Sequence, residues 1–298
     1  MTDSTLPPGI HNKLLNPILY LLGPYRFYEK VFARYGDTFL FVSPNGPVAV
    51  TRDPEHVKQI FTLDTSQIEI FPDNDGPEFI VGKNSVLVMT DDPHRRERRL
   101  LSPPFHGARM RSYAQVMQQA ARDEMKSWSV GQVVDFQLAM QRISLSVIAQ
   151  AVFGLSDPDD VQRTQQLSAD YMNSLNPLML FFPLLRKEYF GRSLFPKTVN
   201  ARRELELLLV EQIQRCRARP QSEDILSMMV HARYDDGSAM SDEQIRDELF
   251  TLMLAGHETT ALGLSWMFYH LYHNPETLVR LRQELATIGT SPDAESIA

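Results

Sequence analysis

The chain has 298 residues, of which 43% are hydrophobic, so it can build a large core in one or two domains. Its net charge of −7 excludes a general nucleic-acid binder, because affinity for phosphate needs an excess of clustered Lys and Arg. A single Cys excludes an internal disulfide and any site built from several Cys. The apolar segment LLNPILYLLG is interrupted by Pro17 and too short to span a bilayer, so we expect a cytoplasmic protein that is peripheral to membranes at this end.

Short β-strands are predicted near the N-terminus. TFLFVS at 38–43 and PVAVT at 47–51 flank Pro-Asn-Gly, a pattern typical of a hairpin. Apolar residues then recur at every third or fourth position, which predicts helices. One begins at residue 54, and others cover 110–128, 136–153 and 197–219. The predicted fold class is mainly α with a small N-terminal β-sheet. No repeat or linker marks a boundary, so we interpret 1–298 as one domain.

The longest predicted helix covers residues 242–273. Ser241 and Gln244 form a capping box before it, and Asn274-Pro275 ends it and begins another helix. At 1.5 Å per residue the helix is roughly 50 Å long. Its middle is apolar on all faces, so we expect it to run through the interior. The following helix is predicted to end at Gly289.

The centre of this helix, LMLAGHETTALG at 252–263, contains residues that weaken a buried helix. Gly256 costs about 1 kcal/mol against Ala, and Glu258 is costly if it is buried alone. Thr259 and Thr260 can turn their hydroxyls onto carbonyls one turn back. Together they indicate a site where Gly admits a flat ligand and where a hydroxyl and a carboxylate pass protons. A polar kink satisfied by neighbouring helices accounts for the same residues.

A zinc site is a weaker interpretation of the same segment. His257 and Glu258 begin the metalloprotease pattern His-Glu-x-x-His, but Ala261 stands at its fifth position. His270 and His273 lie too far along the helix to replace the second ligand. A metallohydrolase is therefore the weakest of the alternatives.

An Arg-rich helix is predicted at residues 91–101, DDPHRRERRLL. Pro93 suits its first turn, and Asp91 or Asp92 can cap it. Positive side chains at this end oppose the helix dipole, so an anionic partner would relieve the conflict.

Two of its basic side chains share one face of the helix. His94 and Arg98 are four residues apart, a spacing that can bind a pair of carboxylates or a phosphate. The other arginines, Arg95, Arg96 and Arg99, point elsewhere. The alternative is a solvated face whose charges are balanced by Glu97 and the two Asp.

These two helices together resemble the cytochrome P-450 family, the haem-thiolate monooxygenases. The long helix is similar to the family's Ala/Gly-Gly-x-Asp/Glu-Thr-Thr/Ser signature, with Ala255 and Gly256 at its start and Glu258 and Thr259 at its centre. The Arg-rich helix is similar to the propionate-binding helix of soluble bacterial members, which carries His-x-x-x-Arg. The order of the elements agrees as well. The resemblance implies the P-450 fold over essentially the whole chain.

The resemblance also implies the cofactor and the roles of residues. Haem b is the expected cofactor and O2 the co-substrate, with electrons from NAD(P)H delivered by a ferredoxin and its reductase or by a flavodoxin-type donor. His94 and Arg98 would bind the propionates, Gly256 would give clearance next to Ala255, and Glu258 and Thr259 would deliver protons. The remaining arginines of the Arg-rich helix would face the acidic redox partner.

A lipophilic substrate is expected from the same resemblance. The family lines its distal pocket with segments that correspond to residues 66–88 and 171–195, which include the apolar NPLMLFFPLL. A fatty acid, terpene or steroid would suit such a lining. Phe181 and Phe182 are interpreted equally well as core packing.

The thiolate ligand of the family is absent from the sequence. Its loop, Phe-x-x-Gly-x-Arg-x-Cys-x-Gly, does not occur, and Cys216 lies in the charged segment QRCRARP. Glu243 to Arg246 match Glu-x-x-Arg only by coincidence. We therefore expect the C-terminal third of the fold, with the axial Cys, to lie beyond Ala298, and the 298 residues alone to be inactive. A relic helical protein that binds ligands without catalysis stays open as the alternative.

Overall fold

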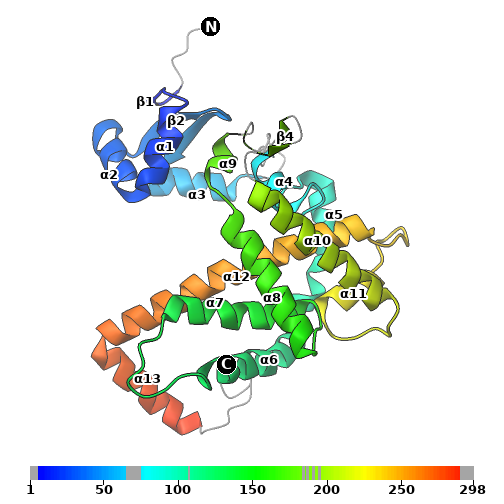
Figure 1. Ribbon diagram of the computed structural model, residues 1–298. Coiled ribbons are helices and arrows are strands. Elements are labelled where there is room, and N and C mark those ends of the chain that lie inside the picture. The colour runs from blue at the N-terminus through cyan, green and yellow to red at the C-terminus, as the bar shows by residue number, and fades with distance from the viewer. Residues whose placement is uncertain are drawn as a thin grey trace. The chain divides into compact units, whose positions relative to one another are not determined.

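The computed structural model describes residues 6–64, 75–106, 108–182, 185, 188–189, 192–193 and 196–288 (Figure 1). The chain divides into two compact units, each assembled from separate segments. The first comprises Met1–Ile80 and Ser174–Val199, and the second Val81–Asn173 and Asn200–Ala298. No helix of the described residues is long and apolar enough to cross a membrane.

The first unit contains the small sheet. Strands β2 (Thr38–Ser43) and β3 (Gly46–Thr51) form the predicted antiparallel hairpin, with Phe41 opposite Val48. The two-residue strand β1 (Gly9–Ile10) adds to β2 in parallel and was not predicted, because two residues carry no periodicity. A Cβ on Gly9 would lie 2.0 Å from the Leu40 carbonyl oxygen, so only Gly fits there.

Helices pack on this sheet and extend the first unit. The core cluster Phe27, Val31 and Phe39 joins the sheet to α2 (Pro24–Tyr35), which follows α1 (Leu15–Leu22). The other elements are α3 (Pro54–Thr62), α9 (Leu178–Phe181), β4 (Glu188–Tyr189) and β5 (Arg192–Ser193). Helix α4 (Asp75–Val81) ends at the first residue of the second unit.

The second unit is helical in its described part. The elements that lie wholly or mainly in it are, in chain order, α5 (Asp91–Leu101), the 3-10 turn η1 (Pro103–Phe105), α6 (Ala108–Met125), α7 (Phe136–Val147), the π-helical turn η2 (Ile148–Val152), α8 (Pro158–Ser174), α10 (Pro196–Arg217), α11 (Ile225–His231), α12 (Asp242–His273) and α13 (Pro275–Ile288). The predicted helices all form, and the predicted bounds of α5 and α12 agree with the structure. The π-helical turn at the end of the 136–153 segment was not predicted.

Helix α12 begins with the predicted capping box, in which Gln244 N donates to Ser241 Oγ and Ser241 N donates to Gln244 Oε1. Its first half is buried, and α7 lies alongside it (Figure 1). The prediction that the whole helix runs through the interior is wrong for its second half, where Leu262, Trp266, Met267, Tyr269 and Tyr272 are exposed. Apolar composition on all faces does not tell which face a neighbour covers. The predicted end at Gly289 lies outside the described residues.

Candidate functional site

The Thr259 hydroxyl donates a hydrogen bond to the carbonyl oxygen of Ala255, one turn earlier on α12. Both residues are exposed, and their spacing of four places them on one face of the helix. The predicted bond onto the preceding turn therefore forms at Thr259. Helical geometry continues unbroken from Asp242 to His273, so the bond does not interrupt the helix.

Glu258 is not buried alone, because its side chain is 40% exposed. Gln141, on α7, donates a hydrogen bond from Nε2 to Glu258 Oε2 at 3.1 Å. The same oxygen lies 3.5 Å from His257 Nδ1. The carboxylate is thus held by a neighbouring helix while it stays accessible to solvent.

His257 is the buried member of this segment, only 4% exposed. Burial lowers the pKa of His257, and the charge of Glu258 opposes that shift. Its Nδ1 has no hydrogen-bond partner within the described part of the chain. The neutral imidazole is therefore the favoured form near pH 7.

Gly256 allows α12 to approach its neighbours closely. A Cβ at this position would lie 3.2 Å from Ile148 Cδ1 in η2, and the Gly256 carbonyl accepts from Ser144 Oγ at 2.8 Å. The space that the missing side chain leaves is used by Ile148. Clearance for a ligand at Gly256 stays a prediction.

Helix α5 begins differently from the prediction. Thr90 is its N-cap, without a side-chain hydrogen bond, and Asp91 and Asp92 lie within the first turn. Asp91 has a φ of 54°, in the left-handed region that Asp tolerates better than most residues. Asp92 is instead 3.4 Å from Arg95 Nη1, so the expected Asp cap is wrong.

His94 and Arg98 are the two basic residues of α5 that have no charged partner in the part of the chain that the structure describes. His94 is half-buried and Arg98 is exposed. Among the described residues neither side chain has an ion pair or a hydrogen bond. A spacing of four residues puts them on one face, where they are available to an anionic group.

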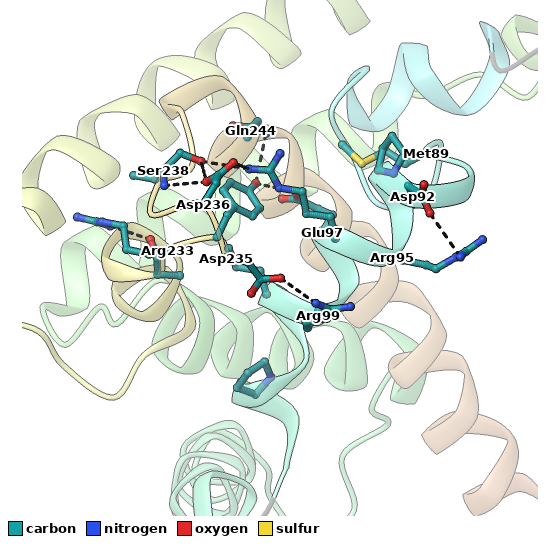
Figure 2. A pocket seen from close by; sticks show the side chains of 17 residues that line it. Met89, Asp92, Arg95, Glu97, Arg99, Arg233, Asp235, Asp236, Ser238 and Gln244 are labelled. Atoms are coloured by element: carbon teal, nitrogen blue, oxygen red, sulfur yellow. Dashed lines mark hydrogen bonds and ion pairs between the residues drawn. The ribbon is translucent and has the colours of Figure 1, made fainter.

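The other three arginines of α5 are each paired with an aspartate, as Figure 2 shows for two of them. Arg96 Nη2 lies 2.8 Å from Asp236 Oδ2, and Arg99 Nη1 lies 2.8 Å from Asp235 Oδ2. Asp235 and Asp236 belong to the loop between α11 and α12, which no local pattern had linked to α5. These side chains are more than half exposed, so each pair contributes less than about 1 kcal/mol.

Glu97 is buried, and it does not balance the arginines as the alternative interpretation required. Tyr234 donates from its hydroxyl to Glu97 Oε2 at 2.7 Å, and Gln244 Nε2 donates to the Tyr234 hydroxyl at 3.3 Å. Burial raises the pKa of Glu97, against the Tyr234 hydrogen bond. Arg96 stacks over the Tyr234 ring at 4.0 Å. Tyr234 therefore connects α5 to the first turn of α12.

The Arg–Asp pairs and Glu97 surround a cavity of about 1050 Å³ between α5 and residues 232–239 (Figure 2). Its walls carry both signs of charge in equal number, because four arginines line it together with Asp92, Glu97, Asp235 and Asp236. The cavity therefore does not present a net cationic site of its own.

Two buried carboxylates of α12 bind the loop that leads into α5. Asp247 accepts from Asn84 N at 3.1 Å and from Asn84 Nδ2 at 2.8 Å, and Glu248 Oε1 accepts from Val86 N at 2.7 Å. Both carboxylates are fully buried. Gly82, with a φ of 96°, has no room for a Cβ, which would lie 2.3 Å from Asp247 Cγ.

No sequence motif predicted a role for this pair, although adjacent Asp and Glu inside an apolar helix are a visible signal. Burial raises the pKa of Glu248 to about 8, helped by the charges of Glu97 and Asp247. Glu248 Oε2 has no partner in the described part of the chain. Arg246 pairs with Asp247 at 2.8 Å.

Parts of the two segments expected to line the substrate pocket, 66–88 and 171–195, lie around one cavity. Phe79 and Ile80 line an apolar cavity of about 200 Å³ in the first unit, together with Leu175 and Pro177. Residues 65–74 lie outside the described part of the chain. The Phe181 ring lies edge-on to Tyr20, with centroids 6.1 Å apart, as core packing predicts.

The structure gives no support to the zinc-site interpretation of α12. The described residues contain no group of three His, Cys, Asp or Glu that could hold a metal ion. Cys216 is 1% exposed within α10, with Arg219 Nη2 at 3.8 Å from its sulfur. The exclusion of Cys216 as the haem ligand stays a prediction.

The comparison with known proteins identifies the family. The family model described as Cytochrome P-450 matches residues 7–296. Cytochrome P-450 138 of Mycobacterium tuberculosis is 33% identical over 291 residues, which cover 95% of this chain and 65% of the relative. Cytochrome P-450 137 of the same organism is 32% identical over 272 residues, covering 90% of this chain and 57% of the relative. The chain thus spans about two-thirds or less of the length of these relatives.

Solved structures agree on the fold. A cyanobacterial protein, CYP120A1, solved with bound retinoic acid, superposes with a TM-score of 0.85 at 22% identity. The haem domain of a mutant of cytochrome P-450DA superposes with a TM-score of 0.79 at 21% identity. Each comparison covers 98% of this chain and 66% of the other. The chain belongs to the cytochrome P-450 family and has the predicted fold of that family.

Proposed function

We propose that this chain forms the propionate-binding and proton-delivering parts of a haem-dependent monooxygenase that inserts one oxygen atom of O2 into a lipophilic substrate. The observation that carries the proposal is the lack of ion pairs at His94 and Arg98. Of the basic residues at 94–99, the three other arginines are paired with aspartates, whereas these two side chains are unpaired within the described residues. A dianionic partner such as the two haem propionates would fit them.

The rest of the proposed site lies on α12. Haem b supplies the oxygen-activating iron when it is bound, with electrons from NAD(P)H. His94 and Arg98 would hold the propionates, and Ala255 would line the haem side of α12. Gly256 would support this indirectly, since its contact with Ile148 sets how closely α12 packs against η2.

Proton delivery falls to Glu258 and Thr259. Glu258 is half-exposed and can exchange protons with solvent, while Gln141 fixes the position of its Oε2. The Thr259 hydroxyl donates to the Ala255 carbonyl and can accept from a water on the exposed face. A water between the two side chains would carry a proton from the carboxyl to the hydroxyl oxygen.

The sequence lacks the family's Cys loop, and the proposal gives no ligand role to Cys216, its single Cys, which is packed within α10. The activity, substrate and partners proposed here therefore concern a protein that supplies this ligand from elsewhere. Its redox partner would be a ferredoxin with its reductase or a flavodoxin-type donor, in the cytoplasm. The apolar cavity at Phe79 and Ile80 and the retinoic acid held by CYP120A1 both favour a lipophilic substrate.

The test is a sequencing read of the source DNA through and past codon 298, on both strands. A Phe-x-x-Gly-x-Arg-x-Cys-x-Gly loop in any frame supports the monooxygenase. A true stop followed by no such loop overturns it and leaves the relic protein. As a second test, haem is titrated into the 298-residue chain, and a thiolate-type spectrum in the presence of carbon monoxide would show that Cys216 had been excluded wrongly.

A further inference from the structure

The 82–88 loop lies between α4 and α5 and covers one side of α12, where Glu248 is located. Val86 N donates to Glu248 Oε1 at 2.7 Å. One turn further along α12, Thr251 Oγ1 forms a hydrogen bond of 2.5 Å with Ser85 Oγ. Ser85 and Glu248 are fully buried, and Thr251 is only 4% exposed. Opening of this loop would therefore bring water to the Glu248 carboxyl.

Three buried carboxyl groups belong to this region, and their partners differ. Asp247 is paired with Arg246, whose Nη2 lies 2.8 Å from Asp247 Oδ1. Glu97 accepts a hydrogen bond from the Tyr234 hydroxyl. In the part of the chain that the structure describes, Glu248 has no cation beside it, and its Oε2 has no hydrogen-bond partner. An ionised carboxyl that is buried without a cation is costly, so Glu248 is the group that we expect to keep a proton while the loop is closed.

The charges near Glu248 also oppose its ionisation. The charged and titratable groups around it are Arg96 and Glu97 from α5, Tyr234 from the loop before α12, and Arg246 and Asp247 from α12. Burial raises the pKa of Glu248 to about 8, and the charges of Glu97 and Asp247 contribute to the rise. Burial and the hydrogen bond to Glu97 raise the pKa of Tyr234, so the Tyr234 hydroxyl stays neutral. Lys83, the single titratable side chain of the 82–88 loop, is exposed.

We propose that the 82–88 loop is a pH-dependent cover of α12, which stays closed while Glu248 is protonated and opens when Glu248 ionises. In the open loop the carboxyl is hydrated and returns to its ordinary pKa of 4.5. Closing the loop therefore takes up a proton between pH 4.5 and pH 8, and each rise in pH within this range favours the open form. The Val86 hydrogen bond opposes the opening, because a carboxylate accepts it more strongly than a neutral carboxyl does. Burial and the charges of Glu97 and Asp247 outweigh this bond, since the pKa is raised in its presence.

An open loop would affect the start of α5. Thr90, the N-cap of α5, follows the loop by two residues, and His94 N donates to the Thr90 carbonyl at 3.3 Å. The second half of α5 is held separately, by the hydrogen bond from Tyr234 to Glu97. Ionisation of Glu248 would therefore displace His94 before Arg98. This consequence for propionate binding rests on the proposed function, whereas the pH-dependent loop goes beyond that function and does not depend on haem.

The test is hydrogen exchange of the 298-residue chain at pH 6, 7 and 8, followed by mass spectrometry of peptides that cover residues 82–89. The intrinsic rate of an unstructured peptide of the same sequence, divided by the measured rate, gives a protection factor. The protection factor should fall at least tenfold from pH 6 to pH 8, because opening releases the proton of Glu248. It should also stay below that of α7 at every pH, since the loop opens without unfolding the helices.

Two variants separate the proton of Glu248 from the contacts of the loop. Glu248→Gln cannot ionise, so its protection factor should change less than twofold from pH 6 to pH 8. Thr251→Val removes the hydrogen bond to Ser85 and should lower the protection factor by the same factor at each pH, which leaves the pH dependence intact. Far-UV circular dichroism checks that both variants keep the helix content of the parent.

Three results would each overturn the proposal. A protection factor that is independent of pH in the parent chain does so without any variant. A pH dependence that Glu248→Gln retains would show that another group titrates. Equal protection of the loop and of α7 would show that the loop opens only when the whole chain unfolds.

Discussion

Replacing Glu248 by Gln should change how the stability of the chain depends on pH. The Glu248 carboxyl is fully buried and its pKa is raised to about 8, against an ordinary value of 4.5. Between those two values the folded chain holds a proton that the unfolded chain has released, so the free energy of unfolding falls as the pH rises. The loss approaches about 1.4 kcal/mol per pH unit. From pH 5 to pH 8 it amounts to about 3–4 kcal/mol.

Glutamine keeps the shape of the neutral carboxyl and removes its titration. Its amide oxygen can still accept from Val86 N, as Glu248 Oε1 does at 2.7 Å. At pH 5 the variant and the parent should therefore agree within about 1 kcal/mol. At pH 8 the variant should be the more stable by about 3–4 kcal/mol.

The assay is urea denaturation followed by far-UV circular dichroism at pH 5, 6, 7 and 8. Groups that do not interact with Glu248 cancel in the difference between variant and parent, so the difference reports this carboxyl and its coupling to Glu97 and Asp247. Glu243→Gln, an exposed residue in the first turn of α12, controls for the loss of one charge. A difference for Glu248→Gln that stays constant from pH 5 to pH 8 would refute the reasoning.

Three further substitutions test the loop and the site. Gly82→Ala should destabilise the chain by about 2–4 kcal/mol in urea, because its Cβ would meet Asp247 at a φ of 96°; an unchanged midpoint would contradict the contact. Thr259→Ala in the haem-loaded protein should divert electrons to peroxide, and unchanged coupling of reductant to product would argue against its role in proton delivery. Arg99→Glu should slow electron transfer from an acidic partner and flatten its salt dependence, and an unaltered rate would remove Arg99 from that interface.

The aspartate partners of α5 add a condition to the last of these predictions. Arg96 and Arg99 are already paired with Asp236 and Asp235 of the loop before α12. An acidic redox partner would have to exchange with these aspartates. Since exposed ion pairs contribute little free energy, the exchange would cost little. The loop aspartates would lower the affinity of the partner by competing for the same arginines.

Local patterns in the sequence determined the limits of the main helices. The capping box at Ser241 and Gln244 and the Asn274-Pro275 step set the ends of α12, because caps act within one turn of the chain. The hairpin at 38–51 followed from strand alternation and its turn residues. The spacing of His94 and Arg98, and of Ala255 and Thr259, followed from helix geometry alone.

Only the tertiary structure decided what these elements contact. Nothing near Glu97 in the sequence points to Tyr234. Asn84 and Val86, the loop partners of Asp247 and Glu248, are more than 160 residues away from them. Composition showed that α1 and α12 are apolar, whereas burial showed that Leu15, Leu19 and Leu22 of α1 and much of the second half of α12 face outward. The chemistry of a side chain determines whether its burial requires a hydrogen-bond partner or an apolar contact. The packing of distant segments determines which residue provides it.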